Sequence, residues 1–253
     1  MAAVAPGVRR VEHIMGMPVV VDVRDAEVDD NDLERMFDWL RFADATFSTY
    51  KDDSEISRIN RGELAIAEAH PDVRDVLDRC EALRIETDGY FDVCAAAAHV
   101  IDPSGLVKGW AVDRAAAMLI EAGLRNFALN VAGDMRLRGR AVPEPCWSVG
   151  IQHPLEPSSI AAVVEANDLA VATSGAYARG DHVIDPHTGR PPVGVLSVTI
   201  AGPELATADA YATAAFAMGE AGIHWTARLR GYEAMTILAD ERVLSTPGFP
   251  SAH

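Results

Sequence analysis

Residues 127–173 read FALNVAGDMRLRGRAVPEPCWSVGIQHPLEPSSIAAVVEANDLAVAT. Short apolar runs in this stretch are separated by Gly, Pro, Asn and Asp, a pattern typical of successive β-strands joined by turns. The sequence predicts strands at Phe127–Val131, Met135–Leu137, Trp147–Ile151, Ala161–Glu165 and Leu169–Thr173. Strands are therefore grouped together in the middle of the chain.

Helical patterns lie on both sides of this strand region. Apolar residues recur at helical spacing over 30–47, 71–87, 109–122, about 205–218 and 221–230, and Ser54 is an expected N-cap of a short helix. Further strands are expected at 14–23, 196–201 and 235–238. Because helices and strands are grouped rather than alternating, we expect an α+β fold with mixed or antiparallel sheets. Residues 1–245 are expected to form a single domain, followed by a loose tail at 246–253.

Composition limits the possible partners. The 253 residues are 49% hydrophobic, which is enough to bury a substantial core. The 22 Lys and Arg stand against 38 Asp and Glu, giving a net charge of −16. This charge argues against a nucleic-acid partner, which requires a basic face. An anionic ligand would have to be met by a metal, by backbone N–H groups or by a few placed cations.

The cysteines and the apolar stretches bear on the compartment. Cys80, Cys94 and Cys146 are odd in number and form no CxxC motif, which predicts neither a disulfide framework nor a thiolate zinc site. Charged residues interrupt every apolar stretch before it reaches membrane-spanning length, and the N-terminal residues show no signal-peptide pattern. We expect a cytoplasmic protein without a membrane segment.

The helix containing TADAYATAAF carries the first candidate site. Asp209 and Thr213 are four residues apart and share one helix face, and their helical neighbours are apolar. A buried carboxylate needs a cation, and two oxygen ligands suit a hard ion such as Mg²⁺. The alternative is that Asp209 complements the helix dipole in the first turn while Thr213 bonds back to the preceding turn.

Three other segments are candidates for ligand contacts. Residues 100–117 form a loop entering a helix, where free N–H groups and Lys108 suit a phosphate, although a turn with a solvated lysine also explains the pattern. His182 is suited to general-base chemistry near neutral pH, or to a structural role. The remaining candidates are ring-stacking or hydrogen-bonding side chains that core packing also explains: Tyr50, Tyr90, Phe91 and Asp92.

The order of these segments resembles a known family. FSTYKDDSEISRIN is followed by GYFDV, by an aspartate before VKGWAVDRAA, and then by NVAGDMRLRG, ATSG, HVIDPHTGRPP and SVTIAGPELATADAYATAAFAMG. This series, from about Met15 to Met218, resembles the FAD:protein FMN transferases of the ApbE family. The chain departs from the family pattern in having only the nine residues Val93–Ile101 between Asp92 and Asp102.

The resemblance implies a T-fold-like α+β architecture and a Mg²⁺-dependent enzyme. Such enzymes cleave FAD at its pyrophosphate, attach FMN to a Thr or Ser hydroxyl of an acceptor flavoprotein and release AMP. Two alternatives stay open: a Mg²⁺-dependent FAD pyrophosphatase that uses water as the nucleophile, and a flavin-binding protein without catalysis. Without an export signal, the implied acceptor is cytoplasmic.

The resemblance also assigns roles to individual residues. His182 would help to deprotonate the acceptor hydroxyl, and the metal would be held by Asp209, Thr213 and the backbone carbonyl of Gly105. The positions implied to contact FAD are Met15, Tyr50, Tyr90, Phe91, Asp92, Asp102, Lys108 and Ile184.

Overall fold

The computed structural model describes residues 7–95, 99–175 and 183–252. Its centre is an eight-stranded sheet in the order β1-β2-β3-β4-β7-β8-β9-β10, in which every neighbouring pair is antiparallel. The strands are β1 (Val8–Ile14), β2 (Met17–Val23), β3 (Phe127–Val131), β4 (Asp134–Arg138), β7 (Leu169–Gly175), β8 (Val195–Gly202), β9 (Glu233–Leu238) and β10 (Val243–Ser245). The α+β class is thus confirmed, with antiparallel strands throughout this sheet.

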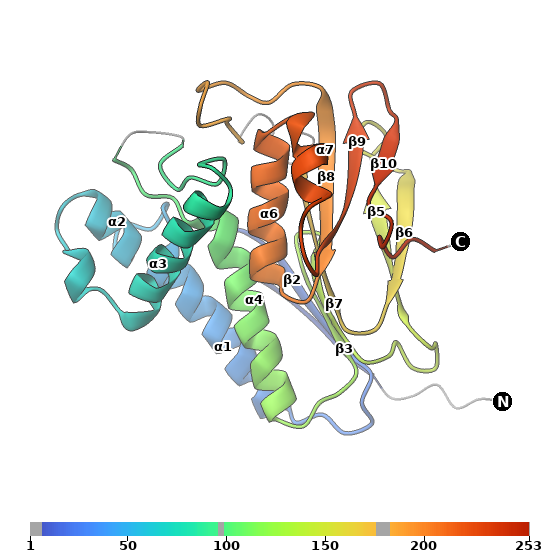
Figure 1. The fold of residues 1–253 in the computed structure, drawn as a ribbon. Helices are drawn as coiled ribbons and strands as arrows, with labels where there is room; N and C mark the ends of the chain where they lie inside the picture. The colour runs from blue at the N-terminus through green and yellow to red at the C-terminus, as the bar shows by residue number, and fades with distance from the viewer. Residues whose placement is uncertain (1–6, 96–98, 176–182, 253) are drawn as a thin grey trace.

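Helices cover one face of the sheet and a second hairpin covers part of the other face (Figure 1). The helices are α1 (Asp30–Phe47), α2 (Glu55–Asn60), η1 (Ile66–Glu68), α3 (Pro71–Glu86), α4 (Ser104–Glu121), α6 (Leu205–Ala217) and α7 (Ala221–Thr226). The hairpin consists of β5 (Trp147–Gln152) and β6 (Ile160–Ala166). Strand alternation separates two cores: Phe127 and Leu129 of β3 face the helices, whereas Ala128 faces the hairpin.

Helix α6 is the central helix of the molecule. It is Ala-rich, and nearly all its side chains are buried between α4 and strands β7 and β8. Small residues let its neighbours approach closely: a Cβ added at Gly109 of α4 would lie 2.6 Å from the Leu205 carbonyl oxygen. A carboxylate on such a helix is enclosed by protein, which makes the setting of Asp209 exceptional.

Most predicted elements are confirmed, and the differences have local causes. The expected strand 14–23 is instead a hairpin, because Met15 (φ +56°) and Gly16 (φ +70°) form a turn between β1 and β2. The helix expected from 109 begins five residues earlier, at Ser104, where the Asp102 carboxylate accepts the Ser104 N–H at 3.0 Å. The apolar pattern did not reveal this cap-like start.

The C-terminal segment differs from the expectation of a loose tail. Phe249 is 9% exposed and packs into the core beneath the β5–β6 hairpin. The Ala252 N–H donates to the Val163 carbonyl at 2.7 Å, and the Glu165 N–H donates to the Pro250 carbonyl at 3.2 Å. A buried aromatic ring and strand-like hydrogen bonds therefore fix residues that their Ser and Pro content predicted to be loose.

Candidate active site

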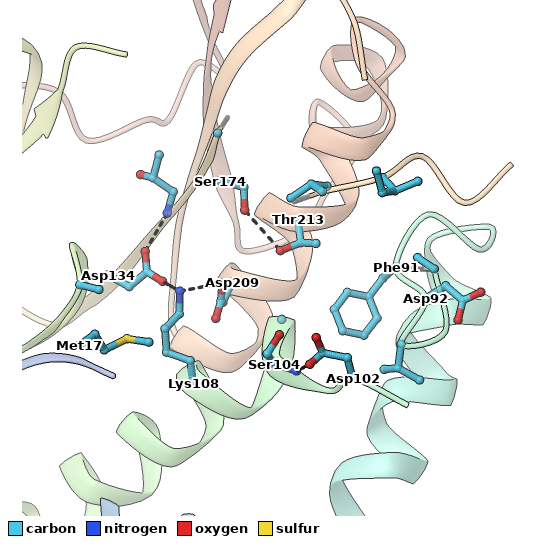
Figure 2. A pocket seen from close by; sticks show the side chains of 18 of the residues that line it. Met17, Phe91, Asp92, Asp102, Ser104, Lys108, Asp134, Ser174, Asp209 and Thr213 are labelled. Atoms are coloured by element: carbon cyan, nitrogen blue, oxygen red, sulfur yellow. Dashed lines mark hydrogen bonds and ion pairs between the residues drawn. The ribbon is translucent and has the colours of Figure 1, made fainter. Parts of the chain in front are cut away.

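A pocket of about 480 Å³ lies where six segments of the chain meet. Its walls come from the β1–β2 turn, residues 90–95, the start of α4, the β3–β4 turn, the end of β7 with residues 183–184, and one face of α6 (Figure 2). Among the described lining residues, the charged side chains are Asp92, Asp102, Lys108, Asp134 and Asp209. Four carboxylates against one ammonium make this part of the pocket strongly acidic.

Asp209 and Thr213 are brought together in the pocket as predicted. Asp209 is 4% exposed, and its Oδ2 is buried without a hydrogen-bond partner among the described residues. It is the fifth residue of α6, beyond the first turn, so complementing the helix dipole does not account for it. Thr213 lies one turn later and its Oγ1 is 3.3 Å from the Ser174 Oγ.

Burial dominates the electrostatics of Asp209. Loss of solvent raises the pKa of this carboxyl well above its ordinary value; Lys108 acts to lower the pKa and Asp134 to raise it. A carboxylate in such a place is stabilised by a cation that brings its own ligands. Asp209 Oδ2 and Thr213 Oγ1 form an oxygen donor set of the kind that Mg²⁺ prefers, so the residues present fit a divalent cation.

Gly105 lies next to this pair, in the first turn of α4. A Cβ added there would be 3.7 Å from Thr213 Oγ1 and 3.1 Å from the ring of Phe91. Glycine therefore keeps the space between the helix start, the hydroxyl and the ring free of a side chain. Its proximity to Thr213 is compatible with the predicted use of its carbonyl group.

Lys108 is neither solvated nor isolated. Its side chain is 21% exposed, and its Nζ forms an ion pair with Asp134 and lies 3.4 Å from Asp209 Oδ1 (Figure 2). The alternative of a solvated lysine at a turn is therefore wrong. The ammonium reaches the pocket from the second turn of α4, between two buried carboxylates.

Aromatic and acidic side chains form the opposite wall. Phe91 is 3% exposed, and the ring of Tyr90 packs edge-on against His187 with centroids 4.5 Å apart. Asp92 accepts the Cys94 N–H at 2.8 Å, and Asp102 accepts the Ser104 N–H. Both carboxylates line the pocket while they also stabilise local turns, so the structural and the ligand-binding interpretation are compatible for each.

Three predicted residues are not brought to the described pocket. Tyr50 is 96% exposed and is not among the residues that line the pocket. Met15 lies in the β1–β2 turn, and the next two residues, Gly16 and Met17, line the pocket. His182 lies outside the described residues, although Ile184, two positions later, lines the pocket. The roles of Met15, Tyr50 and His182 remain predictions.

Asp134 is the functional candidate that the sequence reasoning missed. It is 3% exposed, begins β4 after a turn with positive φ at Ala132 and Gly133, and accepts the Thr173 N–H at 3.0 Å. The signal was the acid in NVAGD: an aspartate directly after a tight turn, at the start of a strand. Its partner Lys108 is distant in sequence, and only the tertiary fold reveals the pair.

The fold and the pocket together define an α+β protein with a carboxylate-rich cavity suited to a divalent cation and its oxygen ligands. A family model described as the ApbE family matches residues 15–100 and 95–236. The chain therefore belongs to the ApbE family.

Curated relatives agree with this assignment. The chain is 37% identical over 130 residues to the FAD:protein FMN transferase of Vibrio cholerae, a match that covers 47% of this chain and 39% of that protein. It is 35% identical over 156 residues to the protein of the same name from Rhodobacter capsulatus, covering 58% of this chain and 30% of the relative. The matched segments thus span only about a third of these relatives' length.

Solved structures match over nearly the whole chain. The flavin transferase ApbE of Vibrio cholerae superposes with a TM-score of 0.86 at 23% identity, covering 97% of this chain and 98% of that one. The ApbE protein of Thermotoga maritima gives a TM-score of 0.85 at 22% identity, covering 96% of this chain and 97% of that one. At this identity, the likeness establishes the shared fold.

Proposed function

We propose that this chain is a Mg²⁺-dependent transferase that moves FMN from FAD onto a Thr or Ser hydroxyl of an acceptor flavoprotein and releases AMP. Membership of the ApbE family and the names of the curated relatives support the transferase activity. The observation that supports the metal part is that the buried Oδ2 of Asp209 has no hydrogen-bond partner among the described residues, while Asp209 lines the pocket together with Thr213. We expect the acceptor to be cytoplasmic.

The proposed reaction exchanges the phosphoanhydride bond of FAD for a phosphoester bond to the acceptor. The acceptor hydroxyl oxygen bonds to the FMN phosphorus while the bond from that phosphorus to the bridging oxygen breaks, and AMP leaves with that oxygen. His182, outside the described residues, is the proposed base that takes the hydroxyl proton. When bound, Mg²⁺ would neutralise charge on the diphosphate oxygens.

The other residues have binding roles in this proposal. Asp209, Thr213 and the Gly105 carbonyl would hold the metal, and Lys108 would place its ammonium beside the phosphates. Tyr90, Phe91 and Ile184 would flank the flavin, while Asp92 and Asp102 would accept hydrogen bonds from FAD. Met15 and Tyr50, which are not among the described lining residues, are also proposed FAD contacts.

The decisive experiment measures both products of the reaction. The purified protein is incubated with FAD, Mg²⁺ and a candidate acceptor flavoprotein; chromatography quantifies AMP and FMN, and mass spectrometry weighs the acceptor. We expect the mass of the acceptor to increase by that of FMN less one water, and AMP to form in an equal amount. Neither product should form in EDTA. Asp209→Asn should abolish both products. Asp113→Asn, which changes a half-buried acid outside the pocket, should retain them.

The alternatives give different results in the same assay. Free FMN and AMP with an unlabelled acceptor would indicate the pyrophosphatase, with water in place of the hydroxyl. FAD that binds but stays intact with every acceptor would indicate a flavin-binding protein without catalysis. AMP release that is unchanged in Asp209→Asn would contradict the proposed metal site.

A further inference from the structure

One ammonium group in the pocket is shared by two buried carboxylates. Lys108 Nζ forms an ion pair with Asp134 Oδ2 and lies 3.4 Å from Asp209 Oδ1 (Figure 2). Asp134 is 3% exposed and Asp209 is 4% exposed. Since a single positive charge cannot neutralise two carboxylates, this group of three side chains, the Lys108 triad, carries a net charge of −1 when all three are ionised.

The Lys108 ammonium is shared unequally between Asp134 and Asp209. The Lys108–Asp134 contact is the closer of the two, whereas 3.4 Å to Asp209 is longer than an ordinary charge-assisted hydrogen bond. The second oxygen of Asp209 has no hydrogen-bond partner in the described part of the chain. The uncompensated negative charge of the triad is therefore concentrated on Asp209, the carboxylate proposed to bind metal.

Asp134 is held rigidly enough to set this distribution. It begins β4, which pairs with β3 on one side and with β7 on the other. Its Oδ1 accepts the Thr173 N–H at 3.0 Å, so the carboxylate is fixed by the sheet. Lys108 extends from α4 on a flexible stem and takes its position from Asp134.

We propose that Asp134 is a positioning residue that holds Lys108 away from Asp209 and so keeps the Asp209 carboxylate available to the divalent cation. This inference rests on the metal site of the proposed function. It assigns to Asp134 a role exercised through Lys108, without contact to the metal itself.

Mere attachment of α4 to β4 does not require this ion pair. Arg136 Nε of β4 lies 3.2 Å from Asp113 Oδ1 of α4, and this second bridge joins the same two elements with the opposite polarity. Asp113 also accepts the Ala206 N–H at 2.8 Å, through its other oxygen. Asp113→Asn is thus a control: it removes a half-buried charge from an α4–β4 bridge outside the pocket.

The test is a double-mutant cycle on Mn²⁺ affinity, measured from the electron paramagnetic resonance signal of free Mn²⁺ during titration of the metal-free protein. Asp134→Asn keeps an oxygen that can accept the Thr173 N–H and removes only the charge. We expect it to weaken Mn²⁺ binding by roughly tenfold to a hundredfold, because Lys108 can then pair fully with Asp209. Lys108→Met should bind Mn²⁺ more tightly than wild type.

The double variant distinguishes this positioning role from a direct electrostatic effect of the Asp134 charge on the bound metal. In the Lys108→Met background, Asp134→Asn should change Mn²⁺ affinity by less than about threefold, because no ammonium remains to be displaced. Equal weakening in both backgrounds, or no weakening by Asp134→Asn alone, would overturn the inference while the metal site stands. A wild-type protein that binds no Mn²⁺ would instead reject the metal site, and the inference with it. Asp113→Asn should leave Mn²⁺ affinity within about twofold of wild type.

Discussion

Among the carboxylates of the pocket, Asp209 is the one proposed to bind the metal. Its carboxylate sits on the most enclosed helix of the molecule, with one oxygen 3.4 Å from Lys108 and the other without a hydrogen-bond partner among the described residues. Burying an uncompensated charge costs stability, whereas an amide of the same shape has no charge to desolvate. A cation bound in the proposed site would offset this cost.

We predict that Asp209→Asn is more stable than wild type in EDTA, by about 1–2 kcal/mol, or roughly 2–8 °C in unfolding temperature. Mg²⁺ should raise the unfolding temperature of wild type and leave that of the variant unchanged. Thermal unfolding followed by circular dichroism, with EDTA and with Mg²⁺, measures both effects.

The same change at Asp113 should stabilise the protein less, or not at all. Burial also raises the pKa of this carboxyl, but the pairing with Arg136 and the Ala206 N–H lower it and so offset part of the cost of the charge. An Asp209→Asn protein that is less stable than wild type in EDTA, or that still responds to Mg²⁺, would contradict this account of the site.

How far sequence predicts this site depends on how local each signal is. Asp209 and Thr213 lie four residues apart on one helix, so helical geometry alone places them together. Asp134 and Lys108 meet only because β4 and α4 pack in the same fold. No spacing rule connects them. For Tyr50, the motif match predicts a ligand contact, but Tyr50 is not among the described residues that line the pocket.

At the level of elements, periodic helices were predictable and special backbone positions were less so. The predicted bounds of α1 agree with the structure, and those of α3 differ by one residue, since both helices carry regular apolar faces and clear starts. The β1–β2 turn was missed because Met15 takes a positive φ that glycine usually provides. Close helix contact was equally invisible in sequence, although it holds Lys108 and Asp209 in the same cavity.

Gly109 provides that close contact, and we predict that Gly109→Ala destabilises the protein by about 2–3 kcal/mol. The added Cβ would lie 2.6–2.7 Å from backbone atoms of Leu205 and Ala206, so α4 and α6 must separate. Better helix propensity of alanine, worth about 1 kcal/mol, offsets only part of this cost. Urea denaturation followed by tryptophan fluorescence measures the change.

Gly123 supplies a matched comparison on the same helix. It follows the end of α4 with φ +93°, and a Cβ there would meet no atom within 4 Å. Gly123→Ala should therefore cost only the backbone strain of about 1 kcal/mol. If Gly109→Ala were tolerated as well as Gly123→Ala, the helices would not be in the tight contact described here.

Over the whole molecule, the charge poses a problem for the proposed substrate. The chain carries a net charge of −16, and the described charged residues of the pocket are four aspartates and Lys108. FAD brings a diphosphate with further negative charge. Among the described residues, no helix has the length and apolarity of a membrane span.

We therefore predict that FAD and Mg²⁺ bind with strong positive coupling. Because the metal neutralises both the pocket and the diphosphate, removing Mg²⁺ should weaken FAD binding by about tenfold or more, and FAD should strengthen Mg²⁺ binding by the same factor. In EDTA, added NaCl should tighten FAD binding through screening, the reverse of anion binding to a basic site. Calorimetric titrations with FAD, and with riboflavin as a ligand without phosphate, test this. Riboflavin affinity should be insensitive to Mg²⁺; equal responses of the two flavins would show that the metal does not act at the diphosphate.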